Sequence, residues 1–372
     1  MLACLPLAGR QIYSRCRGAE PMQTISLDGR SIGPGFPTFV VAEVAQAHDG
    51  SLGMAHAYID AVADVGADAV KFQTHIASAE STLDEPFRVA FSTQDMSRYH
   101  YWRRMEFSDA QWSELAAHTH DRGLAFLSSP FSVEAVRLLQ PLGLQAWKIG
   151  SGELWSKDLL EAVSETGLPV ILSTDLATWD DIRETVYWCK AQGLLYGLMQ
   201  CTTAYPTPFS ELGLNVIDEL REEFDCPVGL SDHSGSMFSG LAAIARGADI
   251  LEVHVTFHRG MFGPDVASSV TVEELKTLCE MRDAVTVLDA HPVDKTVLRP
   301  EMELLRAKFG KSLALVKAFP AGTILARDML TTKKPATGIP LAEIESVLGQ
   351  RLVRDVMPDR LLRRDDLEDL QR

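Results

Sequence analysis

Polar side chains end several short apolar runs of this chain, and their types suit anion and acid–base chemistry. Lys71 and Gln73 end the run DAVKFQT, and Lys148 and Ser151 end the run AWKIGS. Two inward lysines beside serine hydroxyls would form a donor-rich basin for a phosphate and a carboxylate. A solvated loop lysine, or one end of an ion pair, is the alternative for either lysine alone. The polar groups at the run ends are Glu43, Lys71, Gln73, Ser129, Lys148, Ser151, Glu153, Ser173, Thr174 and His254.

Two histidines end neighbouring runs near the end of the pattern. His233 follows the seventh run in LSDHSG, and His254 lies near the end of the eighth. Two imidazoles with nearby carboxylates suit a catalytic divalent metal that keeps positions open for substrate or water. A pair of hydrogen-bonded core histidines is the alternative, and no HExxH motif decides between them. The nearby carboxylates are Glu43, Asp232, Glu252 and Asp265.

The elements that must position these residues alternate in a regular way. Short Val-, Ile- and Leu-rich runs alternate with amphipathic stretches such as 52–66, a pattern typical of βα units around a buried parallel sheet. Eight runs predict an α/β fold of the (β/α)8 TIM-barrel type, in which the C-terminal strand ends converge on one mouth. An open doubly wound sheet is the rival, but no GxGxxG loop follows the first run. The runs are 39–44, 68–74, 124–129, 146–151, 169–174, 196–202, 227–231 and 249–256.

The length and the turn-rich C-terminal segment indicate more than one domain. The chain has 372 residues, which exceeds one ordinary core. We expect an N-terminal extension and lead-in over residues 1–35, with a second methionine at Met22. The barrel is expected over 36–290, a linker over 291–310, and a small β-rich domain over 311–372.

Composition limits the class of protein. Apolar residues make up 46% of the chain and charged residues 23%, as in a soluble globular protein. The net charge of -16 argues against nucleic acid or an anionic membrane as partner, and no apolar run is long enough to span a bilayer. The six cysteines show no CxxC pair, which favours reduced thiols in a cytoplasmic enzyme.

Three further features admit two interpretations each. Tyr205, in CTTAYPTP, could line a pocket or pack against its two prolines. His48, after the first run, could contact substrate or be incidental. The aromatic-rich stretch 98–107 could be a lid over the barrel mouth or a packing edge.

The ordered motifs resemble the sialic acid synthase family, the nonulosonate synthases that join phosphoenolpyruvate to N-acetylmannosamine or a related hexose. The motifs are AEVAQAHDGS, GADAVKFQT, KIGSGE, LST, CTTAYPTP, PVGLSDHS and EVHVT with GPD, and the tail AGTILARDMLTTKKPATGI is similar to the family's antifreeze-like SAF domain. The resemblance runs from about residue 36 to the C-terminus.

The resemblance implies a role for each matching position. His233 and His254 would bind Mn²⁺ or Mg²⁺, and Glu153 would be the acid–base group, with Glu43 and Lys148 as further catalytic candidates. The phosphoenolpyruvate side would consist of Lys71, Ser129, Lys148, Ser151, Ser173 and Ser231. The sugar side would consist of Glu43, Gln73, Thr203, Tyr205, Asp265 and Lys334.

Three departures from the family pattern lie on the sugar side. The first-loop Asn is Ala47, a common Asn before Tyr-Pro-Thr-Pro is Thr203, and the SAF-domain arginine is Lys334. Lysine cannot reproduce the planar fork of a guanidinium. The resemblance therefore implies phosphoenolpyruvate as one substrate more firmly than it implies the identity of the sugar. It also implies a domain-swapped homodimer.

The chemistry implied is attack of the phosphoenolpyruvate methylene carbon on a metal-polarised aldehyde, followed by water addition and loss of phosphate. Two alternatives stay open from the residues. One is a pyruvate aldolase in which Lys148 or Lys71 forms a Schiff base. The other is a non-catalytic barrel that binds a sugar or a partner.

Overall fold

The computed structural model describes residues 23–87, 91–92 and 94–368. The chain divides into two compact units, Met1–His291 and Pro292–Arg372. Our predictions for residues 1–21, for Met22 and for two of the cysteines lie outside the described residues.

The first unit is a closed barrel of eight parallel strands, as the alternating pattern predicts. Each strand from β3 to β9 pairs with the next along the chain, and β10 pairs with both β9 and β3, which closes the sheet. Each predicted run overlaps one barrel strand, so the prediction of a TIM barrel is confirmed. The strands are β3 (Phe39–Ala45), β4 (Ala69–Thr74), β5 (Ala125–Pro130), β6 (Trp147–Ile149), β7 (Val170–Ser173), β8 (Tyr196–Cys201), β9 (Val228–Asp232) and β10 (Ile250–Thr256). A short strand β11 (Val270–Thr271) pairs with the end of β10.

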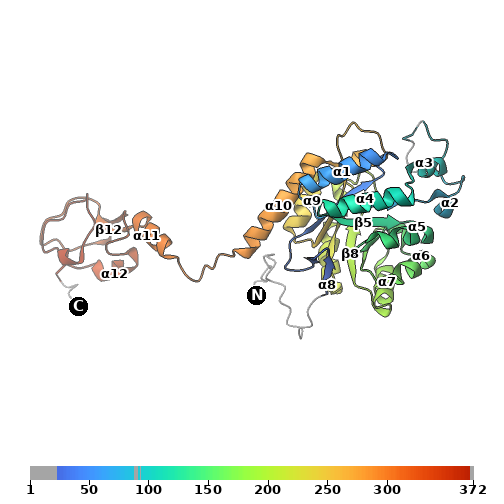
Figure 1. Cartoon of the computed structure of the whole chain (residues 1–372). Coiled ribbons are helices and arrows are strands. Elements are labelled where there is room, and N and C mark those ends of the chain that lie inside the picture. Colours follow the sequence, from blue (N-terminus) through green and yellow to red (C-terminus); the bar gives the residue numbers. More distant parts are fainter. Residues whose placement is uncertain (1–22, 88–90, 93, 369–372) are drawn as a thin grey trace. The chain divides into compact units, whose positions relative to one another are not determined.

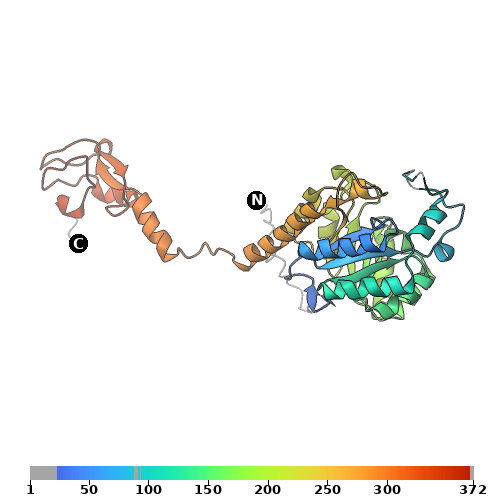
Figure 2. The ribbon, with the colours of Figure 1, turned by 45° about the horizontal axis from the view of Figure 1, so that its top comes forward.

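Helices surround the barrel, and Figures 1 and 2 show α1, α4 and α10 running along its outside. Polar caps define where several of them begin: the Ser51 side chain accepts from the Met54 N–H at α1, and Thr271 and Glu274 form a capping box at α10. The barrel helices are α1 (Leu52–Asp64), α4 (Asp109–Asp121), α5 (Val133–Leu139), α6 (Lys157–Ser164), α7 (Trp179–Ala191), α8 (Leu214–Glu223), α9 (Met237–Ala245) and α10 (Val272–Ala290). Two further helices, α2 (Ala77–Glu80) and α3 (Arg98–Met105), lie in the connection between β4 and α4.

A β-hairpin that we did not predict adds to the barrel core. Strands β1 (Ile25–Leu27) and β2 (Arg30–Ile32) pair antiparallel, and their turn residues Asp28 and Gly29 both have positive φ. Ile25, Leu27 and Ile32 are fully buried in one cluster with inward residues near the N-terminal ends of the barrel strands. The Asp-Gly pair between alternating apolar residues is the sequence signal for such a hairpin. The hairpin leaves the opposite, C-terminal ends of the strands for the polar residues.

The second unit has its own core and little regular structure. Strands β12 (Ser312–Leu315) and β13 (Leu330–Lys333) pair antiparallel, and a short helix α12 (Ile344–Val347) packs into the same buried cluster. A further helix, α11 (Pro300–Phe309), occupies the second half of the stretch that we expected to be linker. Proline at its first position is compatible with a helix start, which the linker interpretation overlooked.

Four cysteines lie in the described residues, Cys189, Cys201, Cys226 and Cys279, and all are buried free thiols. Among the described helices, none combines the length and the apolar character needed to cross a bilayer.

Candidate active site

Two lysines and two glutamates meet at the C-terminal ends of the barrel strands, and we call them the charged cluster: Glu43, Lys71, Lys148 and Glu252. Glu252 Oε1, on β10, lies 3.5 Å from Lys71 Nζ and 3.3 Å from Lys148 Nζ. Glu43 Oε2 also contacts Lys71 Nζ. Every member is at most 5% exposed. The structure thus places both lysines inside the barrel and not in solvent.

Serine hydroxyls from the alternate strands surround the two ammonium groups. Lys71 Nζ donates to Ser129 Oγ at 3.2 Å, and Lys148 Nζ donates to Ser173 Oγ at 2.7 Å. Ser231 Oγ donates to Glu252 Oε1 at 3.2 Å. These contacts gather Lys71, Lys148 and three of the four predicted serines. The fourth, Ser151, is buried beside β6, where its Oγ accepts from the Asp175 N–H.

The two carboxyl groups of the charged cluster have pKa values that are shifted in opposite directions. Burial raises the pKa of Glu43 above that of an ordinary carboxyl group, although Lys71 opposes the shift. Burial would also raise the pKa of Glu252, but Lys148 and Lys71 together hold it below the usual value. Burial opposes the charge on Lys71 as well, yet Glu252 and Glu43 raise its pKa. Glu252 is therefore the fixed anion of the cluster, and Glu43 is the carboxyl that can gain or lose a proton.

Glu43 also carries an unmatched oxygen. Its Oε1 is buried, and no hydrogen bond reaches it from the described residues. A buried carboxylate oxygen without a donor is costly unless water or a ligand supplies one. Glu43 therefore fits a position that faces a bound molecule.

His233 and His254 lie beside the charged cluster with their ring centroids 5.3 Å apart. His233 Nδ1 donates to the Thr202 carbonyl at 2.9 Å, so its Nε2 carries a lone pair, toward which Tyr205 Oη lies at 3.1 Å. Burial and the neighbouring His254 lower the pKa of His233 to about 3, which keeps the imidazole neutral.

His233, neutral and with a lone pair at Nε2, is in the state that metal binding requires. No group of three or more His, Cys, Asp or Glu side chains in the described residues is arranged to hold a metal ion. His233 and His254 could supply two ligands to a divalent ion, whose other positions would be left to water and substrate.

A pocket of about 90 Å³ opens next to His254, and we call it the aromatic pocket. It contains three residues predicted for the sugar side: Gln73, Tyr205 and Asp265. Gln46, which we did not predict, lines it too, with a buried Oε1 that accepts no hydrogen bond from the described residues. The lining residues are Gln46, Gln73, Phe87, Phe91, Arg98, Tyr101, Trp102, Tyr205, His254, Pro264 and Asp265.

The aromatic stretch 98–107 supplies one wall of this pocket. Tyr101 and Trp102 of α3 are buried against Ala77 and Met105, and both also line the pocket. The stretch is therefore a packing edge and a pocket wall together. The sequence could not choose between these two interpretations because Tyr101 and Trp102 do both.

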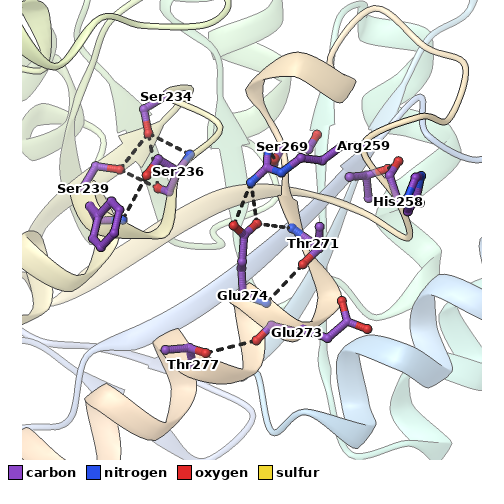
Figure 3. A network of polar contacts seen from close by, with 12 residues as sticks. Ser234, Ser236, Ser239, His258, Arg259, Ser269, Thr271, Glu273, Glu274 and Thr277 are labelled. Carbon is purple, nitrogen blue, oxygen red and sulfur yellow. Dashed lines mark hydrogen bonds and ion pairs between the residues drawn. The ribbon is translucent and has the colours of Figure 1, made fainter.

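The loop that carries Asp265 is held by an arginine clamp. Arg259 Nη2 donates to both oxygens of Glu274, at 2.8 and 2.6 Å, and Arg259 Nη1 donates to the Ser269 carbonyl at 3.2 Å (Figure 3). Ser269 Oγ in turn donates to the Asp265 carbonyl at 2.7 Å. The cap of α10 thus fixes the segment that presents Asp265 to the aromatic pocket.

Glu153 lies in a different place from the charged cluster. It ends the short 3₁₀ turn Ser151–Glu153 and accepts a hydrogen bond from Ser156 Oγ at 2.6 Å. Burial raises its pKa. It faces a second hollow, which we call the acidic hollow, so its acid–base role stays a prediction. The hollow is lined by His75, Ala79, Glu80, Glu85, Arg98, Trp102, Phe131, Ser132, Val133, Glu134, Glu153, Ser156, Asp158 and Leu159.

Other candidates have local structural partners. Asp232 accepts hydrogen bonds from Ser234 and Ser239, which fix the start of α9 (Figure 3 shows the serines). His48 is buried, and its Nδ1 accepts from the Gly50 N–H at 3.0 Å. These residues shape the loops at the barrel mouth.

Thr203, which we predicted for the sugar side, does not line the aromatic pocket. The Thr203 side chain is exposed, and its backbone N–H donates to Asp175 Oδ2 at 2.6 Å. Lys334 belongs to the second unit, where its Nζ lies 5.5 Å from the centroid of the Phe309 ring. Their roles toward the sugar stay predictions.

Comparison with known proteins gives the chain a family. The sequence profile of the NeuB family matches residues 58–291, and that of the SAF domain matches residues 310–368. The chain is 33% identical to N,N'-diacetyllegionaminic acid synthase of Campylobacter jejuni, over 88% of this chain and 99% of that protein. It is 30% identical to human N-acetylneuraminate-9-phosphate synthase, over 91% and 95%.

A solved structure shares the fold. N-acetylneuraminic acid (sialic acid) synthetase from Leptospira borgpetersenii, in complex with citrate, superposes with a TM-score of 0.67 and 28% identity over 77% of this chain and 97% of that one. The identity and the coverage agree with the barrel and the polar strand ends described above. The chain therefore belongs to the NeuB family of nonulosonic acid synthases, enzymes that form a carbon–carbon bond with phosphoenolpyruvate, and it carries a SAF domain at its C-terminal end.

Proposed function

We propose that this enzyme condenses phosphoenolpyruvate with a hexose-type aldehyde, an N-acetylmannosamine-like amino sugar, to give a nonulosonic acid and phosphate, and that it needs a divalent metal ion. The observation that carries the proposal is the charged cluster with its serines, lying beside the imidazoles of His233 and His254 at the barrel mouth.

The donor side suits phosphoenolpyruvate because it offers several hydrogen-bond donors to anions. Lys148 has three ammonium protons and contacts two acceptors, Ser173 and Glu252, so one proton can go to an anion. Lys71 contacts Ser129, Glu43 and Glu252 and would attract an anion through its positive charge. The hydroxyls of Ser129, Ser151, Ser173 and Ser231 can rotate to donate to phosphate or carboxylate oxygens. Glu252 holds the two lysines in place, so the site is organised before the anion arrives.

The acceptor would lie between the imidazoles and the aromatic pocket. His233 and His254 would hold the metal ion, which supplies Lewis-acid polarisation of a carbonyl oxygen when it is bound. Gln73, Tyr205 and Asp265 would orient the sugar hydroxyls from the pocket side. The unmatched oxygen of Glu43 would accept a hydrogen bond from a sugar hydroxyl or from the attacking water.

In the proposed reaction the methylene carbon of phosphoenolpyruvate forms the new bond to the aldehyde carbon. The aldehyde oxygen takes up a proton and becomes a hydroxyl group. Water then adds at carbon 2 and loses its proton to Glu43, the carboxyl group of the charged cluster that can gain a proton. Breaking the carbon 2–oxygen bond releases phosphate and leaves the ketone of the product.

For Lys71, the Schiff-base alternative is disfavoured by the protonation state of its amine. An amine nucleophile must be neutral, and such lysines have a lowered pKa. Glu252 and Glu43 instead raise the pKa of Lys71. Lys71 is therefore suited to hold an anion and not to attack a carbonyl carbon.

We further propose a homodimer that acts in the cytoplasm. Leu304, Leu305 and Phe309 of α11 are exposed, as is expected of a helix that packs against a second copy. The free thiols of the described cysteines agree with a reducing compartment.

The direct test is phosphate release from phosphoenolpyruvate across a panel of aldoses. We expect release to require both a sugar and a divalent ion, and to fall about 100-fold or more in Lys148→Ala. The matched control is Lys190→Ala, an exposed lysine on α7. Equal release from Lys148→Ala and wild type, or release without any sugar, would contradict the proposal.

A further inference from the structure

Gln73 ends in an amide group whose two halves differ in hydrogen-bonding character. The carbonyl oxygen Oε1 can only accept a hydrogen bond, and the NH2 group can only donate one. Gln73 lies on β4 and lines the aromatic pocket together with Tyr205 and Asp265. The half of the amide that is left for the pocket therefore decides which kind of substrate atom Gln73 can bind.

The carbonyl half of this amide is occupied by His75, two residues further along the chain. His75 Nε2 lies 3.3 Å from Gln73 Oε1. A carbonyl oxygen needs a neighbour that carries a proton, so Nε2 is the donor in this contact. Because His75 holds Oε1, the NH2 group is the half of Gln73 that a ligand in the pocket can meet.

Glu80 holds the other side of the His75 ring. Its Oε1 lies 2.5 Å from His75 Nδ1, and the Glu80 side chain is only 8% exposed. Both neighbours of the ring are acceptor oxygens, so the ring satisfies them by donating from each nitrogen. The carboxylate of Glu80 compensates the positive charge that such a doubly protonated ring carries.

Two aromatic side chains keep the His75 ring from turning. The ring is stacked between Trp102, at 3.7 Å between centroids, and Phe131, at 4.3 Å, with 12° between the planes in both cases. The face of an aromatic ring attracts a cation, so the stack also suits a ring that donates from both nitrogens. Together with Glu80, the stack leaves the imidazole one orientation, in which Nε2 points to Gln73.

We propose that His75 is a positioning residue for the acceptor sugar. Held by Glu80, it keeps the carbonyl oxygen of Gln73 occupied, so that the Gln73 NH2 group donates a hydrogen bond to the sugar. The sugar atom that meets Gln73 is then an oxygen with a free lone pair, in a hydroxyl or carbonyl group. This proposal rests on the proposed function, and in it His75 itself touches no substrate.

Two replacements of His75 separate hydrogen-bond donation from stacking. Phenylalanine keeps a ring between Trp102 and Phe131 but has no donor, whereas glutamine lacks the ring but carries an N–H at about the reach of Nε2. Phosphate release from phosphoenolpyruvate is measured with the full chain and the aldose that wild type uses best.

We expect His75→Phe to raise the KM for the sugar about tenfold and to leave the KM for phosphoenolpyruvate unchanged. His75→Gln should stay within about threefold of wild type, because the donor is kept. A residue that only packs would give the opposite order, with phenylalanine tolerated better than glutamine. The control is His120→Phe, the same change at an exposed site on α4, which should leave both KM values as in wild type.

Replacements of Gln73 test the direction of the amide. Gln73→Glu keeps an oxygen for His75 but offers the pocket a second oxygen in place of the NH2 group, whereas Gln73→Leu offers neither. We expect Gln73→Glu to raise the KM for the sugar at least as much as Gln73→Leu does, by about tenfold. Adding His75→Phe to Gln73→Leu should change this KM by less than about twofold, because the residue that His75 positions is gone.

The outcomes separate the two claims. The positioning role alone is overturned if His75→Phe leaves the KM for the sugar unchanged or raises that for phosphoenolpyruvate equally. It is also overturned if His75→Gln is no better than His75→Phe, or if Gln73→Glu keeps the wild-type KM for the sugar. No phosphate release from wild type with any aldose overturns the proposed function and the inference with it.

Discussion

Glu252 and Lys148 form an ion pair across the interior of the barrel, with 3.3 Å between Oε1 and Nζ. They come from β10 and β6, which are not neighbours in the sheet. The same oxygen lies 3.5 Å from Lys71 on β4. One carboxylate thus fixes two ammonium groups from different sides of the barrel mouth.

Replacing Glu252 by Gln should destabilise the protein, because the two buried ammonium groups lose the carboxylate that they share. The variant leaves two ammonium groups with less compensation, so we expect the free energy of unfolding to fall by about 3 kcal/mol. Phosphoenolpyruvate supplies the missing negative charge, so it should raise the unfolding temperature more in Glu252→Gln than in wild type. Thermal unfolding with and without the ligand measures both effects. If phosphoenolpyruvate raises the unfolding temperature of Glu252→Gln less than that of wild type, the ligand does not replace the lost negative charge.

Tyr205 and a metal ion would compete for the same lone pair on His233. Tyr205 Oη lies 3.1 Å from Nε2, so removing the hydroxyl in Tyr205→Phe should leave Mn²⁺ affinity equal or higher. His233→Ala should lower it about 100-fold or more, since one of the two protein ligands is lost. Titration calorimetry with Mn²⁺ alone measures this without any turnover. A His233→Ala protein that binds Mn²⁺ as wild type does would remove these histidines from the metal site.

Loss of the Arg259 clamp should weaken binding of the sugar and leave binding of phosphoenolpyruvate unchanged. Arg259→Ala frees the segment that presents Asp265, so we expect the KM for the sugar to rise severalfold. Arg259 is 45% exposed, so the ion pair with Glu274 should contribute no more than about 1 kcal/mol to folding. Steady-state kinetics with each substrate varied in turn gives the comparison. An equal rise in the KM for phosphoenolpyruvate would show that the clamp acts on the whole mouth.

Asp366 makes the folding stability of the second unit depend on pH. Burial alone would raise its pKa, but Arg360, which donates two hydrogen bonds at 2.7 and 2.9 Å, and the Arg363 N–H hold it below the usual value. A lowered folded-state pKa gives stability that is present above about pH 4, the unfolded value, and is lost as the pH falls through the folded value.

Asp366→Asn should therefore destabilise the second unit by about 2 kcal/mol at neutral pH and by less below pH 4. Hydrogen exchange of the amides in β12 and β13 of the full chain reports this unit. A difference from wild type that stays constant between pH 7 and pH 3 is the contrary result.

The sequence predicted the barrel because parallel strands buried on both faces are continuous apolar runs, and each run was present. It predicted Lys71, Lys148 and the serines together because all of them lie toward the C-terminal ends of the apolar runs, which barrel closure brings to one mouth. It did not predict the hairpin at residues 25–32, although its Asp-Gly turn was a usable signal, because we assigned that stretch to the lead-in segment.

Other parts of the site depend on side-chain direction, which spacing does not specify. Glu252 looked like one of several carboxylates near the histidines, and only the closed barrel shows that it reaches two lysines. Gln46 lies in the first loop, where an irregularity in the pairing of β3 and β4 follows Glu43. Glu153 follows a strand end as expected, but its 3₁₀ turn directs it to the acidic hollow.

The central claim is that phosphoenolpyruvate bound at the charged cluster forms a carbon–carbon bond and then loses phosphate by carbon–oxygen cleavage. The most direct measurement uses phosphoenolpyruvate labelled with ¹³C at the methylene carbon and ¹⁸O in the bridge to phosphorus. We predict a ¹³C signal bonded to the former aldehyde carbon of the sugar, with the ¹⁸O recovered in inorganic phosphate. Pyruvate as the ¹³C product, with ¹⁸O retained on its carbonyl, would contradict the account.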